Sequence, residues 1–194
     1  MRILSGKLKG SKILTNNDKI KGSESFITRP TSDRVKETLF NIVQHGFNID
    51  FNKISFLDCF AGSGAIGLEA ISRGCSSVFF LEKNNTSCEC IKKNLANLKL
   101  GYNDKKSIYS ILNYDFFDKS LLLDKEFDVV FLDPPYEMVE VSEVFLRLKE
   151  LRVTKKNSLI IYESNKELVD VDKLEILKSR KTGKTHLSFL KFLA

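Results

Sequence analysis

The chain has little of what marks membrane, secreted or zinc-binding proteins. Its longest apolar runs are only a few residues, too short for a membrane span or for the core of a signal peptide. Its four cysteines and two histidines form neither a C-x-x-C pair nor a Cys/His cluster, which argues against a zinc site. We therefore expect a cytoplasmic protein with reduced, structural cysteines and no bound metal.

Proline is also scarce, and two of the three prolines are adjacent, in Asp133-Pro134-Pro135-Tyr136. This tetrapeptide directly follows the apolar run Phe127–Leu132, and a pair of prolines ends a strand because proline has no backbone N–H. Ligands of open α/β sheets bind at the carboxyl ends of the strands. We interpret the tetrapeptide as a clamp for a planar amine, in which Asp133 and the Pro134 carbonyl accept its two N–H bonds and Tyr136 stacks on the ring.

The net charge of +6 is concentrated at the two ends of the chain. Residues 1–40 hold nine Lys and Arg against four Asp and Glu, and residues 173–194 hold six against one. The middle of the chain, residues 41–172, holds sixteen against twenty. Lysine and arginine bind phosphates without regard to base sequence, so this split indicates a nucleic-acid contact beside a nearly neutral body. The alternative, that the lysines only keep the ends soluble, stays open.

The order of apolar runs and helical patterns predicts a doubly wound α/β sheet. A basic hairpin or extension over residues 1–28 precedes a main domain over residues 29–194. Thr31 or Ser32 caps a first helix that ends near Gly46. The later predicted elements alternate: strands Ile54–Asp58, Val78–Glu82, Ser107–Leu112, Phe127–Asp133 and Ser158–Tyr162; helices Ala65–Arg73, Asn84–Leu98 and about Met138–Leu151; and a final antiparallel pair, Leu174–Lys178 with Leu187–Leu193.

A glycine-rich loop, Asp58–Gly67, follows the first strand of this pattern with G-x-G-x-x-G spacing. Glycines let the backbone turn sharply and approach a ligand. The spacing alone also fits dinucleotide enzymes, but Asp58 would face their pyrophosphate at short range. S-adenosylmethionine has no phosphate and carries an ammonium group that a carboxylate can bind. We therefore favour S-adenosylmethionine over NAD.

Two further acids fit the same cofactor. Glu82 ends the second strand, twenty residues after Gly62, where it can accept hydrogen bonds from ribose hydroxyls. Asp115 can accept from the adenine amine, or can simply cap a turn. For Phe116 and Phe117 we expect core packing rather than ring contacts. The predicted cofactor-binding residues are Asp58, Phe60, Ala61, Gly62, Ser63, Gly64, Glu82, Asp115 and Asp133.

Several motifs together resemble the bacterial 16S rRNA (guanine-N2)-methyltransferases of the RsmD family. They are Met1–Ile3 with Gly6 and Gly10, Arg29–Asn41, Asp58–Ala70 with Ser72–Gly74, Asp133–Tyr136, and Gly183–Thr185. The resemblance implies a class I S-adenosylmethionine-dependent methyltransferase fold, a Rossmann-like sheet of seven strands whose last strand is antiparallel. It also implies that Asp133 to Tyr136 hold the target guanine, in a free or partly assembled small subunit.

The resemblance is incomplete at two places: the N-terminal hairpin has lysines where the family tends to have arginines, and Thr182 replaces a frequent aromatic. We expect a monomer in which Asp133, Pro134 and Tyr136 are catalytic. Methylation of DNA adenine or of a glutamine amide, a non-catalytic RNA-binding assembly factor, and a dehydrogenase are the alternatives. The candidate RNA contacts are Arg2, Lys7, Lys9, Lys12, Arg29, Arg34 and Lys184.

Overall fold

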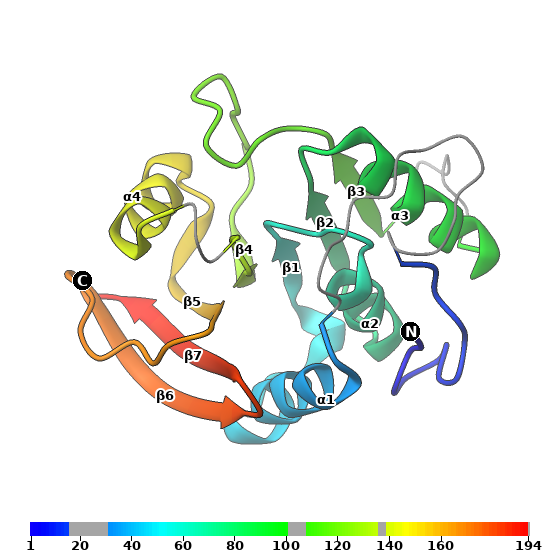
Figure 1. Ribbon diagram of the computed structural model, residues 1–194, viewed down its shortest axis with the longest axis horizontal. Helices are drawn as coiled ribbons and strands as arrows, with labels where there is room; N and C mark the ends of the chain where they lie inside the picture. The colour runs from blue at the N-terminus through cyan, green and yellow to red at the C-terminus, as the bar shows by residue number, and fades with distance from the viewer. Residues whose placement is uncertain (16–30, 101–107, 136–138, 194) are drawn as a thin grey trace.

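A computed structural model describes residues 1–15, 31–100, 108–135 and 139–193 of the chain (Figure 1). Seven strands form one sheet in the order β3-β2-β1-β4-β5-β7-β6. Neighbouring strands are parallel except for β7, which is antiparallel to both β5 and β6. This confirms the predicted α/β fold with a reversed last strand. The strands are β1 Ser55–Asp58, β2 Ser77–Leu81, β3 Tyr109–Leu112, β4 Phe127–Leu132, β5 Thr154–Ser164, β6 Leu174–Thr182 and β7 Thr185–Phe192.

Helices cover both faces of the sheet. The first begins at its predicted cap, since the Ser32 hydroxyl accepts a hydrogen bond from the Val35 N–H at 3.2 Å. A π-helical turn continues it to Gly46, as expected. The helix after the glycine loop has the predicted bounds and ends at Gly74, whose φ of +103° suits glycine. The helical segments are α1 Asp33–Asn41, η1 Ile42–Gly46, η2 Phe51–Lys53, α2 Ala65–Arg73, α3 Asn85–Asn97 and α4 Val141–Leu151.

Several predicted boundaries differ from the structure; β5, for example, begins at Thr154 instead of Ser158 and β7 at Thr185 instead of Leu187. The expected start of α4, near Met138, lies outside the described residues, and the helix begins at Val141 after an extended Glu140. Strand β5 continues past Tyr162, because the polar Glu163 and Ser164 still pair with β7. Strand β6 likewise continues to Thr182. Both extensions consist of polar residues that hydrogen-bond through their backbones, which an apolar pattern does not reveal.

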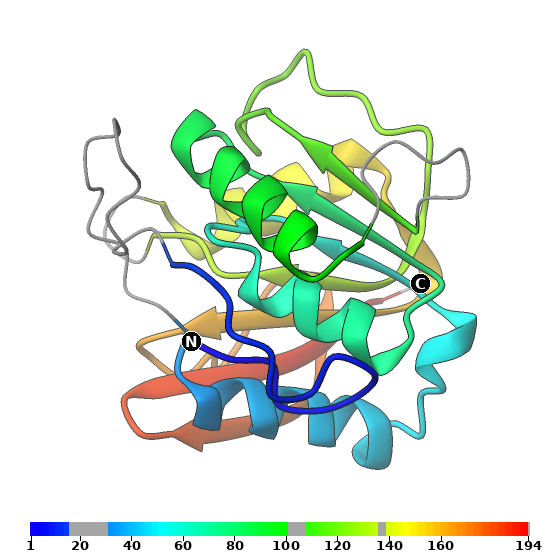
Figure 2. The ribbon, with the colours of Figure 1, turned by 90° about the vertical axis from the view of Figure 1, so that its right-hand side faces the viewer.

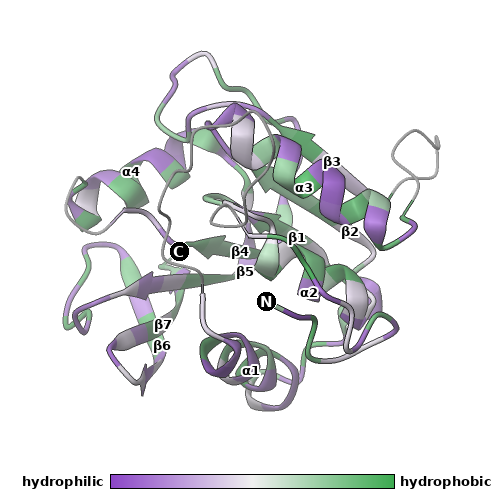
Figure 3. Ribbon diagram, turned by 45° about the vertical axis from the view of Figure 1, so that its right-hand side comes forward, coloured by the Kyte–Doolittle hydropathy of each residue, from purple (hydrophilic) through white to green (hydrophobic). Residues whose placement is uncertain are grey.

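The core has two layers, one on each face of the sheet. Phe56, Phe131 and Ile161 pack towards α1, α2 and α3, whereas their neighbours in sequence pack towards α4. This is the alternation of side chains along a strand. Figure 2 shows α1, α2 and α3 in front of the sheet and α4 behind it. In Figure 3, α3 and α4 alternate hydrophobic and hydrophilic residues, as helices with one buried face do.

The N-terminal segment, residues 1–15, packs against α2 and α3. It folds back on itself through one antiparallel bridge between Arg2 and Lys12. Its apolar residues Ile3 and Ile13 are buried. The Lys7 N–H donates to the Ser72 carbonyl at 2.8 Å. The basic segment is thus attached to the main domain rather than separate from its core.

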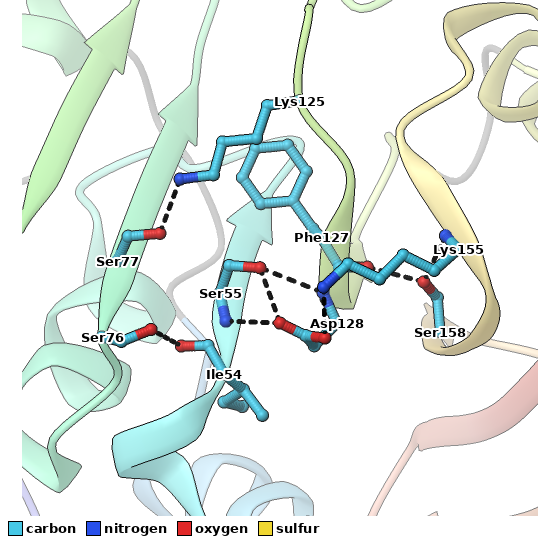
Figure 4. Close-up of polar contacts among 9 residues, drawn as sticks. All are labelled: Ile54, Ser55, Ser76, Ser77, Lys125, Phe127, Asp128, Lys155 and Ser158. Carbon is cyan, nitrogen blue, oxygen red and sulfur yellow. Dashed lines mark hydrogen bonds and ion pairs between the residues drawn. The ribbon is translucent and has the colours of Figure 1, made fainter.

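The amino ends of β1, β4 and β5 are joined by a polar cluster (Figure 4). The Asp128 carboxylate accepts from the Ser55 N–H and hydroxyl, both at 2.8 Å, and from the Lys155 ammonium at 2.6 Å. The Ser158 hydroxyl donates to the Phe127 carbonyl at 2.6 Å. These bonds fix the register of three central strands at the edge opposite their carboxyl ends.

The described residues contain neither a membrane-spanning helix nor a metal-binding cluster. Within residues 1–15, 31–100, 108–135 and 139–193, no helix has both the length and the apolar character needed to cross a membrane. The same ranges contain no group of three or more Cys, His, Asp and Glu side chains arranged to bind a metal. All four cysteines are buried and unpaired by disulfides.

Candidate active site

A pocket of about 660 Å³ opens at the carboxyl ends of β1, β2, β4 and β5. We divide its lining residues into two groups by the elements that carry them. The first arm is the lining from β1, β2, the glycine loop and the turn at Asp115, and the second arm is the lining from Asp133, β5, β7 and the start of α1. The residues of the first arm include Asp58, Phe60, Ala61, Gly62, Ser63, Glu82, Asp115, Phe116 and Phe117; those of the second include Thr31, Ser32, Asp133, Pro134, Pro135, Glu163 and Thr185.

The glycine loop has backbone conformations that require glycine. Gly62 and Gly64 have φ of +53° and +81°, and no heavy atom lies within 4 Å of the place where a Gly62 Cβ would stand. A ligand can therefore approach the backbone here. Gly67 has the opposite surroundings, because a Cβ there would overlap the Phe80 ring. The third glycine thus lets α2 pack closely on β2.

Asp58 is a buried carboxylate at the base of the first arm, with 1% of its surface exposed. Its Oδ2 accepts from the Gly67 N–H at 3.1 Å, and its Oδ1 has no hydrogen-bond partner among the described residues. Burial raises the pKa of Asp58 to about 8, and the nearby Asp133 and Glu82 carboxylates add to the rise, against the Gly67 hydrogen bond. An orphaned buried carboxylate oxygen fits the ammonium group of an amino-acid ligand.

Glu82 has a structural contact that the sequence did not reveal. Its Oε2 accepts from the Gly62 N–H at 2.8 Å, and its Oε1 accepts from the Asn84 N–H at 2.8 Å. The carboxylate therefore holds the glycine loop to the end of β2. Each carboxylate oxygen has a second acceptor site, so Glu82 can still accept from the hydroxyls of a ribose.

Asp115 caps a turn and also lines the pocket. Its Oδ1 accepts from the Phe117 N–H at 3.0 Å, and its Oδ2 lies 3.3 Å from the Lys83 ammonium. Phe116 is buried, with its ring centroid 5.0 Å from that of Phe60. Asp115 therefore caps a turn, one of its two expected roles, and still has its side chain at the pocket wall, while Phe116 packs in the core.

Asp133 and the two prolines follow β4 directly and line the pocket. Pro134 is buried and Pro135 is exposed. Burial raises the pKa of Tyr162 to about 12, and the negative charge of Asp133 adds to this rise. Asp133 likewise adds to the rise that burial causes in the pKa of Asp58. Tyr136, the predicted stacking residue, lies outside the described residues.

Besides Asp133, the second arm contains four polar residues that were not predicted as site residues. Glu163 ends β5 just beyond the predicted strand, and only 4% of its surface is exposed. Thr185 begins β7 and is buried, while Thr31 and Ser32 precede α1. One signal was available for Glu163: an acid also stands at the carboxyl ends of β1, β2 and β4.

Six of the seven candidate RNA contacts lie in the described ranges, and all six side chains are exposed. Four belong to the N-terminal segment and one to α1, and Lys184 belongs to the turn between β6 and β7, which lies beside the start of α1 in Figures 1 and 2. Arg29 is outside the described residues. The six are Arg2, Lys7, Lys9, Lys12, Arg34 and Lys184.

Comparisons with known proteins agree with this fold and pocket. The family model described as Conserved hypothetical protein 95 matches residues 1–191. Ribosomal RNA small subunit methyltransferase D of Haemophilus influenzae is 37% identical over 185 residues, which are 94% of this chain and 89% of that protein.

Solved structures show the same fold. The structure of yhhF from Escherichia coli has a TM-score of 0.78 at 28% identity, covering 100% of this chain and 98% of that one. A T. thermophilus 16S rRNA methyltransferase in complex with AdoMet and guanosine shares the fold at a TM-score of 0.65 and 18% identity, over 87% of this chain and 46% of that one. The chain therefore belongs to the family of ribosomal RNA small subunit methyltransferase D.

Proposed function

We propose that the chain transfers the methyl group of S-adenosylmethionine to the exocyclic N2 amine of a guanine in small-subunit (16S) ribosomal RNA. The observation that carries this proposal is the pairing of Asp58 and Asp133 in one pocket. Asp58 is buried and has a carboxylate oxygen available for a cation. Asp133 follows β4, the strand beside β1, and precedes two prolines. This arrangement can hold a charged methyl donor next to a planar amine.

The first arm supports the cofactor assignment. When bound, S-adenosylmethionine supplies a methyl group activated by its positive sulfur and leaves as S-adenosylhomocysteine, while Asp133 or a water takes the proton that the methylated amine loses. Asp58 would bind the ammonium group of its amino-acid tail, Glu82 its ribose hydroxyls and Asp115 its adenine amine. Phe60, Ala61, Ser63 and Gly64 would complete the wall, with the backbone at Gly62 open to the ligand. No metal is needed for these contacts.

The second arm supports the base assignment. Asp133 and the Pro134 carbonyl would accept the two N–H bonds of the guanine amine, which turns the nitrogen lone pair towards the methyl group. Tyr136 would stack on the base. Alignment of this kind can lower a barrier by roughly 7 to 11 kcal/mol, so positioning is the main contribution. The two carboxylates also favour the positive charge that develops on the amine.

We propose RNA as the partner because the exposed basic residues of the N-terminal segment, α1 and the β6–β7 turn are attached to the same domain as the pocket. An unstacked base in an RNA loop reaches such a pocket at a smaller cost than a base in a duplex. The substrate would be a small ribosomal subunit or an assembly intermediate in the cytoplasm, and the enzyme would act as a monomer.

The proposal is tested by supplying labelled S-adenosylmethionine with small subunits that lack the modification. Nuclease digestion and mass spectrometry should locate the label on the N2 amine of one guanine. Label in protein, or in DNA when DNA is offered, would contradict the assignment.

Asp133→Ala tests the clamp in the same assay. We expect single-turnover methylation to fall by at least about 10²-fold, because the amine loses its acceptor and its alignment. Calorimetry should show that S-adenosylmethionine still binds within a few-fold of wild type. An unchanged single-turnover rate would remove the clamp from the mechanism.

A further inference from the structure

We propose that Glu163 reads the N1–H of the target guanine and makes the pocket select guanine over other purines with an N2 amine. The proposal rests on the proposed function and deepens it. It assigns a specificity role to a residue at the carboxyl end of β5 that the clamp itself does not use.

The strand register places Glu163 on the face of the sheet that α1 and α2 cover. In β5, Ile161 packs towards α1 and α2, and Tyr162 packs towards α4. Side chains alternate along a strand, so Glu163 lies on the same side as Ile161. Its partner on β7 is Leu187, which belongs to the same layer of the core, and Thr185 stands two residues before it. Glu163 and Thr185 both line the second arm.

Glu163 also stands next to the clamp. Leu132 of β4 pairs with Tyr162 of β5, so Asp133 and Glu163 are the next residues of two adjacent parallel strands. Both line the pocket, and Glu163 is 96% buried, since only 4% of its surface is exposed. Two carboxylates at neighbouring strand ends, one of them almost entirely withdrawn from water, favour a ligand with several N–H donors.

Guanine presents such a donor edge. Its N2 amine and N1–H are adjacent on the Watson–Crick edge, the edge by which enzymes read extruded bases. With the amine held by Asp133 and the Pro134 carbonyl, the N1–H would be directed to the neighbouring strand β5, where Glu163 would accept it. A purine with a bare N1 would instead direct a lone pair at a buried carboxylate. A site built to bond an N–H rejects ligands that lack it by roughly 10²-fold or more.

The test compares guanosine with 2,6-diaminopurine riboside, which keeps the N2 amine but has an acceptor at N1. Small-subunit RNA carrying either nucleoside at the methylated position is assayed for kcat/KM. Wild type should prefer guanosine by roughly 10²-fold. Glu163→Gln should lower this preference at least tenfold, because the amide N–H can donate to a bare N1. Glu126→Gln, an exposed acid at the amino end of β4, is the matched control and should leave the preference unchanged.

Glu163→Asp provides a second measurement if the glutamine variant does not fold. Its carboxylate is one methylene shorter, so we expect guanosine methylation to fall more than diaminopurine methylation. Equal losses on both substrates, or an unchanged preference, would overturn the role of Glu163 while leaving the proposed function intact. Methylation of neither RNA by wild type would overturn both. Calorimetry with S-adenosylmethionine should give the same affinity for Glu163→Gln as for wild type.

Discussion

At the scale of single residues, Asp58 combines the features expected of a cation-binding group. It is buried, it is held by the Gly67 N–H, and one of its oxygens has no partner in the described part of the chain. Its raised pKa, about 8, means that Asp58 is largely protonated at neutral pH before a cation binds. An incoming ammonium group would displace that proton, since the ion pair needs the charged carboxylate.

Binding of S-adenosylmethionine near pH 6.5 should therefore release up to about one proton, and the affinity should rise with pH up to about 8. Asp133 and Glu82 are the charged groups that act on Asp58, and both disfavour its ionised form. Calorimetry in buffers of different ionisation enthalpy measures the released protons.

The control for this measurement is Asp58→Asn, which removes the titrating group and keeps the shape of the side chain. We expect the variant to bind the cofactor at least tenfold more weakly and without proton release. A wild-type protein that releases no proton would show that Asp58 is already charged before the cofactor arrives.

Part of this site could be predicted from the sequence, because its acidic residues stand at the ends of predicted strands. Asp58, Glu82 and Asp133 follow or end strands, so their side chains had to meet at one edge of a parallel sheet. Glu163 follows the same rule and was missed, because its strand extends beyond the apolar run that defined it. The bond between Glu82 and the Gly62 N–H could not be predicted, since it depends on the path of the loop.

At the scale of elements, the N-terminal segment depends on contacts that no local pattern reveals. The Leu4 N–H donates to Glu69, 65 residues later, at 2.8 Å. Glu69 is buried and also binds Arg73 at 2.9 Å, so a charged pair inside the domain holds the segment. The sequence predicted the bounds of α2 correctly from its periodicity, but not that α2 would hold the first residues of the chain.

Gly6 and Gly10 allow a matched test of this attachment. Both have positive φ, at +80° and +86°, so alanine at either position is strained by roughly 1 to 2 kcal/mol. Only at Gly6 would a Cβ also overlap the Ser72 carbonyl, whereas Gly10 has no heavy atom within 4 Å of its Cβ position. We expect Gly6→Ala to lower the thermal midpoint more than Gly10→Ala and to make trypsin cleave faster after Lys7 and Lys9, because the backbone of the segment detaches from α2. Equal behaviour of the two variants would show that the close approach to α2 does not stabilise the segment.

At the scale of the whole molecule, both basic ends of the chain are attached to the nearly neutral domain that contains the pocket. The N-terminal segment is attached through α2, and the β6–β7 turn lies beside α1, so charges from both ends of the chain are held on the domain that carries the pocket. Composition predicted the charge asymmetry. Only the folded chain shows which helices hold the two ends.

RNA affinity should consequently depend on salt, with a contribution from the N-terminal lysines. Replacing Lys7 and Lys9 by glutamine should lower the magnitude of the slope of log K against log salt concentration by roughly 1 to 1.5, because fewer counterions are released. The control replaces Lys53 and Lys156, two exposed lysines elsewhere on the domain, and should leave the slope unchanged. Filter binding over a salt series measures both. Equal slopes for the two double variants would place the RNA on another face.

The Asp128 cluster ties β1, β4 and β5 together at the edge farthest from the pocket. The hydrogen bonds that join these three strands and the residues that line the pocket therefore lie at opposite ends of the strands. Substitutions among the loops at the carboxyl edge can redirect the chemistry without loosening the sheet beneath them. The methyl acceptor of this protein could therefore be changed by design while the Asp128 cluster is kept as it is.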